Sequence, residues 1–338
     1  MWHNLTYYVG RMMETRMSSF ARMILGSVVF GSMLVLPGCG SSGSAQVEGE
    51  LLSTEKQLRQ LEESIKNRTL RNANIIVQYA DVLRARRPEL SGQLNQLKKE
   101  ATTESPIFQS LKSRLQAVKD GSETFENWTD KVAELQAIQS GADSSVYNDA
   151  LSDTVNVIAD MSGGELARVN AVSQESEQKL NNSQNYGQGS QYVGNPHYGS
   201  WSHGSGGSFW VWYGQYAFFS SMFGRDRYYY HDWSRRRGYS YYHDVGRNSY
   251  TSRKHRSAMA DVDRRAEKQF RSSGRYQSPY SKQRRGSSGL SAKSTAQSKS
   301  IFKSKYASSG GGSRYSSSYS GGSRNSGSRT SRGLSRGK

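Results

Sequence analysis

The charge of this 338-residue chain is divided very unevenly, and this division constrains the fold more than any other feature of the sequence. Residues 39–182 carry 16 Lys and Arg against 21 Asp and Glu, a net charge of −5. Residues 183–338 carry 27 against 6, a net charge of +21. Such asymmetry is typical of a folded part joined to a basic part that interacts with partners. We therefore expect the two halves to be organised differently.

Residues 47–180 have the pattern of amphipathic helices, and we expect a mainly α fold, either a small helical bundle or a long helical hairpin. Apolar residues recur every seven positions from Leu51, and we expect this first helix to continue to Arg87, because the residue before a proline disfavours the α conformation. Ser105 is the expected N-cap of a helix that starts at Pro106. The helices expected after the first lie at residues 90–99, 106–120, 125–138 and 146–161.

No catalytic pattern is visible in this helical half. It has no histidine and, after residue 39, no cysteine. We expect its carboxylates, such as Glu62, Glu63, Asp149 and Asp153, to lie on solvated helix faces beside Lys and Arg. The sequence has no Gly-rich phosphate loop, zinc-ligand spacing or nucleophile elbow here. We therefore interpret residues 47–180 as a scaffold that offers a surface to a protein partner.

Aromatic residues dominate the segment that follows. Residues 181–208 are rich in Asn, Gln, Ser and Gly, which predicts a linker, and 209–250 form an aromatic-rich segment. The first 15 residues of this aromatic-rich segment carry no charge, but they are fewer than the ~20 residues needed to span a membrane. Either they contact a membrane interface or a partner, or they pack against the helical half. The aromatic candidates are Phe209, Trp210, Trp212, Tyr213, Phe218 and Phe219, and the candidate contacts to an anionic surface are Arg225, Arg227, Arg235, Arg236 and Arg237.

Two His-Asp pairs raise the alternative of a metal-assisted hydrolase. His231-Asp232 and His243-Asp244 lie 12 positions apart, and a carboxylate that orients a histidine is common in metal and nucleophilic sites. However, adjacent residues point in different directions in regular structure, and no nucleophile or third ligand has a suggestive spacing. We therefore expect no enzyme, no metal, no cofactor and no catalytic residue.

Residues 251–338 have the composition of a basic low-complexity tail, which we expect to be disordered. From Ser272 onward there is no acidic residue, and apolar residues are too sparse to offset an ordering entropy of about 1–2 kcal/mol per residue. Arginines interleaved with tyrosines are typical of nucleic-acid binding, with guanidinium groups on phosphates and rings stacked on bases.

The only cysteine, Cys39, cannot form an intramolecular disulfide, because the chain has no second thiol. It follows a stretch in which Arg16 and Arg22 supply positive charge and residues 23–36 carry none. A basic region followed by roughly 7–15 apolar residues and a small-residue processing site is the pattern of a secretory signal peptide. Fourteen residues are too few for a membrane-spanning helix, which needs about 20.

The four residues that end at this cysteine resemble the lipobox of bacterial lipoproteins, in which leucine stands three places before the cysteine and a small residue one place before it. They are Leu36, Pro37, Gly38 and Cys39, and Pro37 departs from the family pattern, which usually has Ala, Ser, Thr or Val there. The resemblance implies that residues 1–38 are a signal peptide, that Cys39 carries lipid such as palmitate, and that 39–46 form a lipidated tether. The residue that follows the cysteine is Gly40 and not Asp. In the lipoproteins that this stretch resembles, this implies sorting to the outer membrane if the host has two membranes.

Outside residues 22–40 the chain is similar only in composition to uncharacterised envelope lipoproteins of proteobacteria. We therefore expect a lipid-anchored outer-membrane protein with a structural or interaction role, in which a helical spacer presents the aromatic and basic region to anionic partners. The partners that fit this chemistry are lipopolysaccharide, anionic phospholipid and extracellular DNA. If the signal were misleading, the basic region would instead favour an intracellular nucleic-acid-binding protein.

Overall fold

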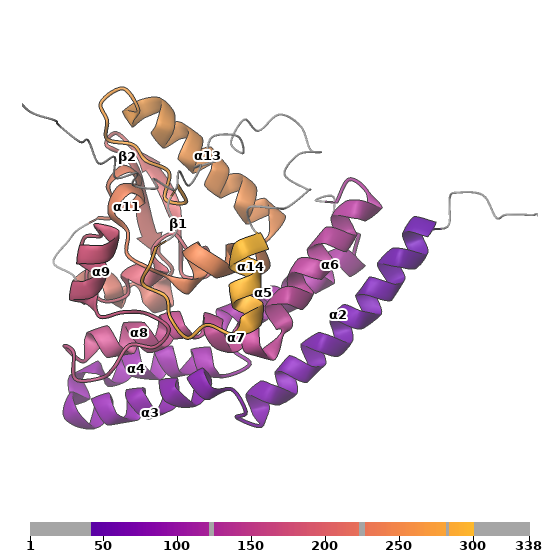
Figure 1. The fold of residues 1–338 in the computed structure, drawn as a ribbon, viewed down its shortest axis with the longest axis horizontal. Coiled ribbons are helices and arrows are strands. Elements are labelled where there is room, and N and C mark those ends of the chain that lie inside the picture. The colour runs from indigo at the N-terminus through magenta and orange to yellow at the C-terminus, as the bar shows by residue number, and fades with distance from the viewer. Residues whose placement is uncertain (1–41, 122–124, 223–226, 282–283, 301–338) are drawn as a thin grey trace, which may run out of the picture.

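The computed structural model describes residues 42–121, 125–222, 227–281 and 284–300 (Figure 1). The described part is mainly helical with one two-stranded sheet, so the predicted fold class is confirmed at that level. Four predicted features lie outside the described residues: the signal peptide, the lipobox with Cys39, Arg225, and the part of the tail that follows residue 300. The predictions for them stay predictions.

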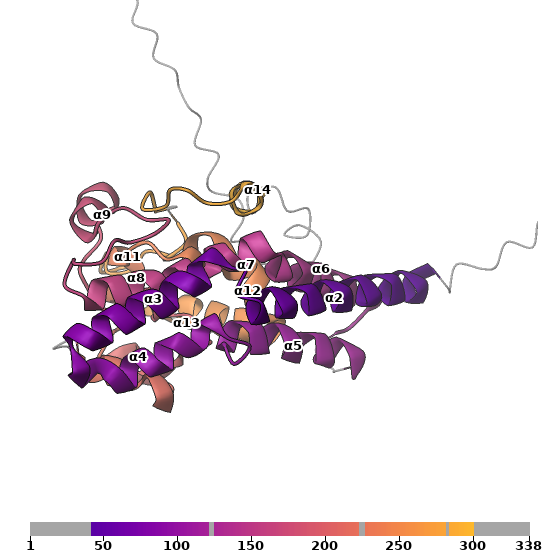
Figure 2. The ribbon, with the colours of Figure 1, turned by 90° about the horizontal axis from the view of Figure 1, so that it is seen from below.

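The helical half forms two sets of packed helices. α2 lies along α6 and also contacts α5, while α3 packs against α4 and α8 (Figures 1 and 2). Their apolar faces share one core, to which Leu61, Ile76 and Leu135 belong, all fully buried. The helices are α2 (Ser42–Lys66), α3 (Arg71–Arg86), α4 (Ser91–Lys98), α5 (Pro106–Lys119), α6 (Trp128–Ala142), α7 (Ser144–Ala150) and α8 (Ser152–Met161).

The helix boundaries predicted from proline and glycine positions agree with those in the structure. α3 ends at Arg86, before Pro88, and α5 begins at Pro106 with Ser105 as its N-cap residue. The Ser105 side chain does not cap that helix, however; its hydroxyl donates to Glu100. α8 ends before Gly163, whose φ of +74° favours glycine.

Two expected helices are each divided in the structure. The first breaks at residues 67–70, where Arg68 adopts a φ of +55° and the chain turns into α3. The second, expected at 146–161, is split at Leu151 into α7 and α8.

The helix expected to start at Phe125 starts instead at Trp128, because the Asn127 side chain accepts a hydrogen bond from Asp130 N and caps it.

The second half folds onto the first, and the prediction of a linker at 181–208 is wrong. Tyr186, Tyr192 and Tyr198 are buried, and the rings of Tyr192 and Tyr198 stack with their centroids 3.7 Å apart. Large aromatic side chains bury enough apolar surface to order a chain that is otherwise polar. The helix α9 (Gln174–Asn181) leads into this segment.

The aromatic segment forms a hairpin and several short helices. β1 (Gly199–Gly204) pairs antiparallel with β2 (Gly207–Trp212), with Trp201 opposite Trp210. Because side chains alternate across a strand, Trp210 and Trp212 face inward while Val211 is exposed. The helices that follow are α10 (Phe218–Met222), α11 (Tyr230–Arg236), a π-helix (Tyr242–Gly246) and α12 (Arg247–Tyr250).

The prediction of a disordered tail from residue 251 is wrong for its first part. α13 (Arg253–Phe270) is an 18-residue helix that packs against β2 and α11. Its buried side chains are spaced three or four residues apart on one face, as expected for an amphipathic helix. They are Met259, Val262, Ala266 and Phe270. Further along, α14 (Ala292–Ser300) packs against the π-helix and α7.

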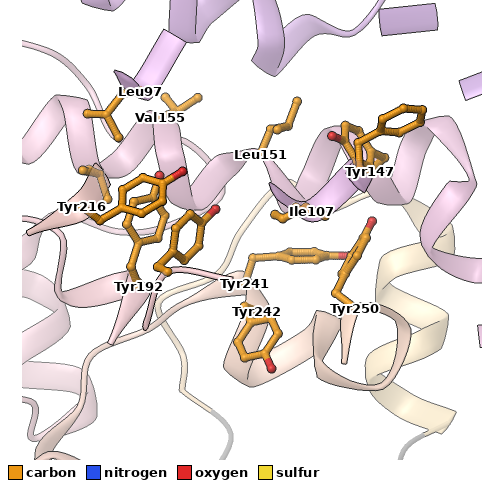
Figure 3. Close-up of a cluster of buried hydrophobic side chains, with 14 of the residues drawn as sticks. Leu97, Ile107, Tyr147, Leu151, Val155, Tyr192, Tyr216, Tyr241, Tyr242 and Tyr250 are labelled. Carbon is orange, nitrogen blue, oxygen red and sulfur yellow. The ribbon is translucent and has the colours of Figure 1, made fainter. Parts of the chain in front are cut away.

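The two halves meet in one continuous core. Figure 3 shows Leu97, Ile107, Leu151 and Val155 of the helical half facing a group of tyrosines from the second half. Within the described residues, the helical half and the second half therefore share one interior. The tyrosines labelled in Figure 3 from the second half are Tyr192, Tyr216, Tyr241, Tyr242 and Tyr250.

Candidate functional site

The junction between the halves contains a buried carboxyl group, Glu100, which is inaccessible to solvent. Its Oε1 accepts a hydrogen bond from Tyr216 (2.5 Å), and its Oε2 accepts from Ser105 (3.1 Å) and Tyr198 (3.3 Å). Burial disfavours the ionised form and raises the pKa of Glu100 to about 7, although these hydroxyl donors act in the opposite direction.

A second buried carboxyl, the side chain of Asp153 on α8, binds backbone amides of the second half. Tyr241 N (2.7 Å) and Tyr242 N (3.0 Å) donate to it, together with the Ser240 hydroxyl (3.2 Å). Burial raises the pKa of Asp153 to about 7 as well. The expectation of a solvated Asp153 is therefore wrong.

The same correction applies to Asp149, which is buried and accepts a hydrogen bond from Ser291 N at 2.7 Å. Asp149 lies on α7, where Val146, Tyr147 and Ala150 are buried beside it, and Asp153 lies on α8, where Val155 and Val157 are fully buried on different sides of the helix. We call Glu100 and Asp153 the junction carboxyls. Perturbed carboxyls often mark functional sites, but these two are enclosed and joined to structural donors, which indicates a role in joining the halves.

The two His-Asp pairs have different partners: His231 Nε2 lies 3.5 Å from Asp232 Oδ2, whereas Asp244 binds Arg237. The His231 ring stacks on Phe270 with centroids 4.2 Å apart, and its Nε2 lies 2.7 Å from Arg275 Nη2. His243 Nε2 lies 2.9 Å from the Val193 carbonyl oxygen, and burial lowers the pKa of His243, which keeps the ring neutral. Within residues 42–300, as far as they are described, no three His, Cys, Asp or Glu side chains are grouped as metal ligands.

Asp244 is paired with Arg237 and not with its neighbouring histidine. Two guanidinium nitrogens of Arg237 donate to the two Asp244 oxygens at 2.9 and 2.6 Å, and its Nε donates to the Pro279 carbonyl at 2.8 Å. Arg237 is only 2% exposed, so the prediction that it contacts an anionic surface is wrong. A planar guanidinium that binds a carboxylate in this bidentate manner can be accommodated in a core.

The other predicted arginines differ in exposure. Arg227 and Arg236 are exposed, and Arg235 is partly exposed. Arg227 lies over the Phe209 ring at 4.6 Å from its centroid, so its charge is held at the surface by a cation–π contact. These three side chains remain candidates for contact with anions.

The predicted aromatic residues mostly complete the core. Trp210, Trp212 and Phe219 are buried, Phe209 and Phe218 are half-buried, and Tyr213 is exposed. The packing interpretation therefore holds for the three buried residues. Exposed apolar surface remains at Val211 and Tyr213, at the end of β2.

Sequence analysis missed a basic face on α13, opposite its buried side chains. Within the described residues, Lys254, Arg265 and Lys268 have no carboxylate partner, whereas Arg264 pairs with Asp261 and Arg271 with Glu267. We call the five exposed cations the α13 basic face, namely Lys254, Arg264, Arg265, Lys268 and Arg271. The spacing of the buried side chains of α13 was the signal that would have revealed it.

Comparisons with protein-family models, curated proteins and solved structures gave no match for this chain. Among the helices of the described segments, none combines the length and the apolar character that crossing a membrane requires. The function is therefore inferred from the residues themselves.

Proposed function

We propose that this chain is a lipid-anchored outer-membrane protein with a structural or interaction role, which binds phosphate-bearing anionic envelope components. The α13 basic face is the observation that carries the proposal. It is a row of cations on a helix whose opposite side is fixed in the core, so the charges keep their positions with respect to a partner. Attraction to clustered phosphates is multivalent and is screened by salt.

The position of α2 supports an anchor at Cys39. Ser42, the first described residue, lies three positions after the cysteine and begins α2. At about 1.5 Å per residue, this 25-residue helix is about 37 Å long. Its start lies at the edge of the described part in both ribbon views and packs against the start of α6, where Gly43 approaches the Trp128 ring (Figures 1 and 2). A lipid on Cys39 would bring this edge of the folded body to the membrane surface.

Charge reversal on the α13 basic face tests the partner. We expect Arg265→Glu combined with Lys268→Glu in the full chain to weaken binding to anionic phospholipid vesicles, lipopolysaccharide or duplex DNA by at least about tenfold at low salt, and to flatten its dependence on salt. Arg71→Glu with Lys112→Glu reverses two exposed cations of the helical half and is the matched control. Comparing the three probes identifies the anion source, and unchanged binding to all of them would contradict the proposal.

Lipidation is tested by incorporation of radiolabelled palmitate in a bacterial host. We expect label in the wild-type chain and none in Cys39→Ser, whose protein should leave the membrane fraction. The cysteine is the only thiol in the sequence, so the substitution removes the only site for thioether or thioester attachment. Label that persists in Cys39→Ser would refute the anchor.

A further inference from the structure

A groove of about 650 Å³ lies where the C-terminal end of α8 meets the start of α9 and the loop around residues 185–188. Figure 1 shows α8 and α9 on the same side of the molecule. Sites for small molecules commonly have volumes of about 300–1,000 Å³ and form between separate parts of a fold. Residues from the helical half, Asp160 and Arg168, line this groove together with Asn185 and Gln188 from the second half.

The two charged side chains that line the groove, Asp160 and Arg168, are paired with each other, and Arg168 also binds Glu177 beside the groove. Arg168 Nε lies 3.6 Å from Asp160 Oδ1, and Arg168 Nη1 donates to Glu177 at 2.7 Å. All three side chains are more than nine-tenths buried. An anionic ligand would meet a guanidinium that two carboxylates already neutralise, and a cationic ligand would have to compete with that guanidinium. The ligand that fits best is uncharged.

Polar atoms beside the groove lack partners. Gln191 is 4% exposed and its Nε2 donates to Asp160, but its Oε1 has no hydrogen-bond partner among the described residues, nor does Arg168 Nε. Gln191 and Arg168 line an adjoining cavity of about 20 Å³, which has room for one water molecule. Buried polar groups are normally satisfied, so an acceptor and a donor are here left for a ligand or an ordered water.

The remaining lining consists of amides, a hydroxyl and carbon surface. Gln174, Asn185 and Gln188 supply amide groups, and Leu166 with several alanines supplies the apolar part. No aromatic side chain lines this groove within the described residues, which disfavours a nucleotide or another flat aromatic ligand. Sugar rings offer hydroxyls at their edges and C–H groups on their faces, and so match both parts of this lining.

From these observations we infer that the groove between α8 and α9 binds a short, uncharged oligosaccharide. Amide side chains donate to and accept from its hydroxyls, Asp160 and Arg168 fix its orientation, and Leu166 packs against a ring face. The inference does not depend on the lipid anchor or on the α13 basic face.

Calorimetric titration of the full chain with three trisaccharides tests this inference. We expect at least one of the uncharged probes, maltotriose and the N-acetylglucosamine trimer, to bind at least about tenfold more tightly than the galacturonate trimer, whose ring is similar but anionic. Gln174→Ala with Gln188→Ala removes two side chains that make no other hydrogen bond in the described residues, and should weaken this binding at least about tenfold. Gln215→Ala with Gln269→Ala, at two exposed glutamines outside the groove, is the control and should leave binding unchanged.

Three results would overturn the inference: no binding of either uncharged trimer, equal binding of the charged one, or unchanged binding in the groove variant. If that variant fails to fold by circular dichroism, Ala167→Trp narrows the groove from an exposed position and should give the same loss. The charge-reversed α13 variant should retain sugar binding, which separates failure of this inference from failure of the proposed binding to anions.

Discussion

Replacing Arg237 with alanine is expected to destabilise the folded chain by about 3–5 kcal/mol, because Asp244 would then be a buried carboxylate without a cation opposite it. The two side chains are 3% and 2% exposed and are joined by two hydrogen bonds. The backbone amides of Ser240 (3.2 Å) and Arg284 (3.4 Å) also donate to this carboxylate but carry no compensating charge, and the Arg284 guanidinium donates to the carbonyl oxygens of Asn181 and Arg235 instead. Urea unfolding followed by circular dichroism measures the loss.

The comparison that isolates this effect uses two further variants. Arg236→Ala changes an exposed neighbour and should stay within about 0.5 kcal/mol of the wild type. Arg237→Met with Asp244→Leu removes both charges and should recover most of the stability, since buried ion pairs are often replaced by apolar side chains at little cost. A midpoint for Arg237→Ala equal to that of the wild type would show that the pair does not contribute as expected.

The parts of the fold that could be predicted from sequence depend on local stereochemistry. Pro88 and Pro106 restrict the residues next to them, so the end of α3 and the start of α5 follow from the sequence alone. Gly163 similarly marks the end of α8 by its positive φ. No partner distant in the chain is needed for any of these boundaries.

The parts that could not be predicted depend on contacts between distant segments. Glu100 and Tyr216 lie 116 positions apart, and Asp153 and Tyr241 lie 88 apart. Nothing near Asp153 in the sequence indicates that backbone amides of the second half will surround it. The average polarity of residues 181–208 likewise concealed the tyrosines whose burial orders them.

The arginine sites show the same limit. Arg237 follows Arg235 and Arg236, and a run of three cations usually lies on a surface; only Asp244, seven positions later, distinguishes the third. α13 was different, because its apolar residues Met259, Val262 and Phe270 have helical spacing. The low-complexity character of the residues beyond it conceals a pattern that the sequence does contain.

Titration of Glu100 is expected to make the chain lose stability as the pH rises through neutrality. The folded-state pKa is about 7, above the ordinary value of 4.5, because burial disfavours the carboxylate. Between these two values the folded chain binds more protons at Glu100 than the unfolded chain does. The contribution of this group is therefore fully present below about pH 4.5 and is lost as the pH rises through 7, by a total of about 3 kcal/mol.

Other buried groups titrate in the same range, so the wild-type profile alone does not isolate Glu100. Asp153 acts in the same direction, since burial also raises its pKa to about 7. His197 acts in the opposite direction, because burial lowers its pKa to about 4 and the unfolded chain binds more protons there between about pH 4 and 6.5. Only a difference between two variants removes these common contributions.

Glu100→Gln provides that difference, since glutamine has nearly the same shape and does not ionise. We expect its free energy of unfolding, relative to the wild type, to rise by about 2.5 kcal/mol between pH 5 and pH 8, measured by urea unfolding at several pH values. Glu104→Gln, four positions away and exposed, should differ from the wild type by less than about 0.5 kcal/mol at every pH. A pH-independent difference for Glu100→Gln would mean that Glu100 is ionised throughout this range. Tyr216 and Tyr198 would then be stabilising a buried carboxylate where we expect a neutral acid.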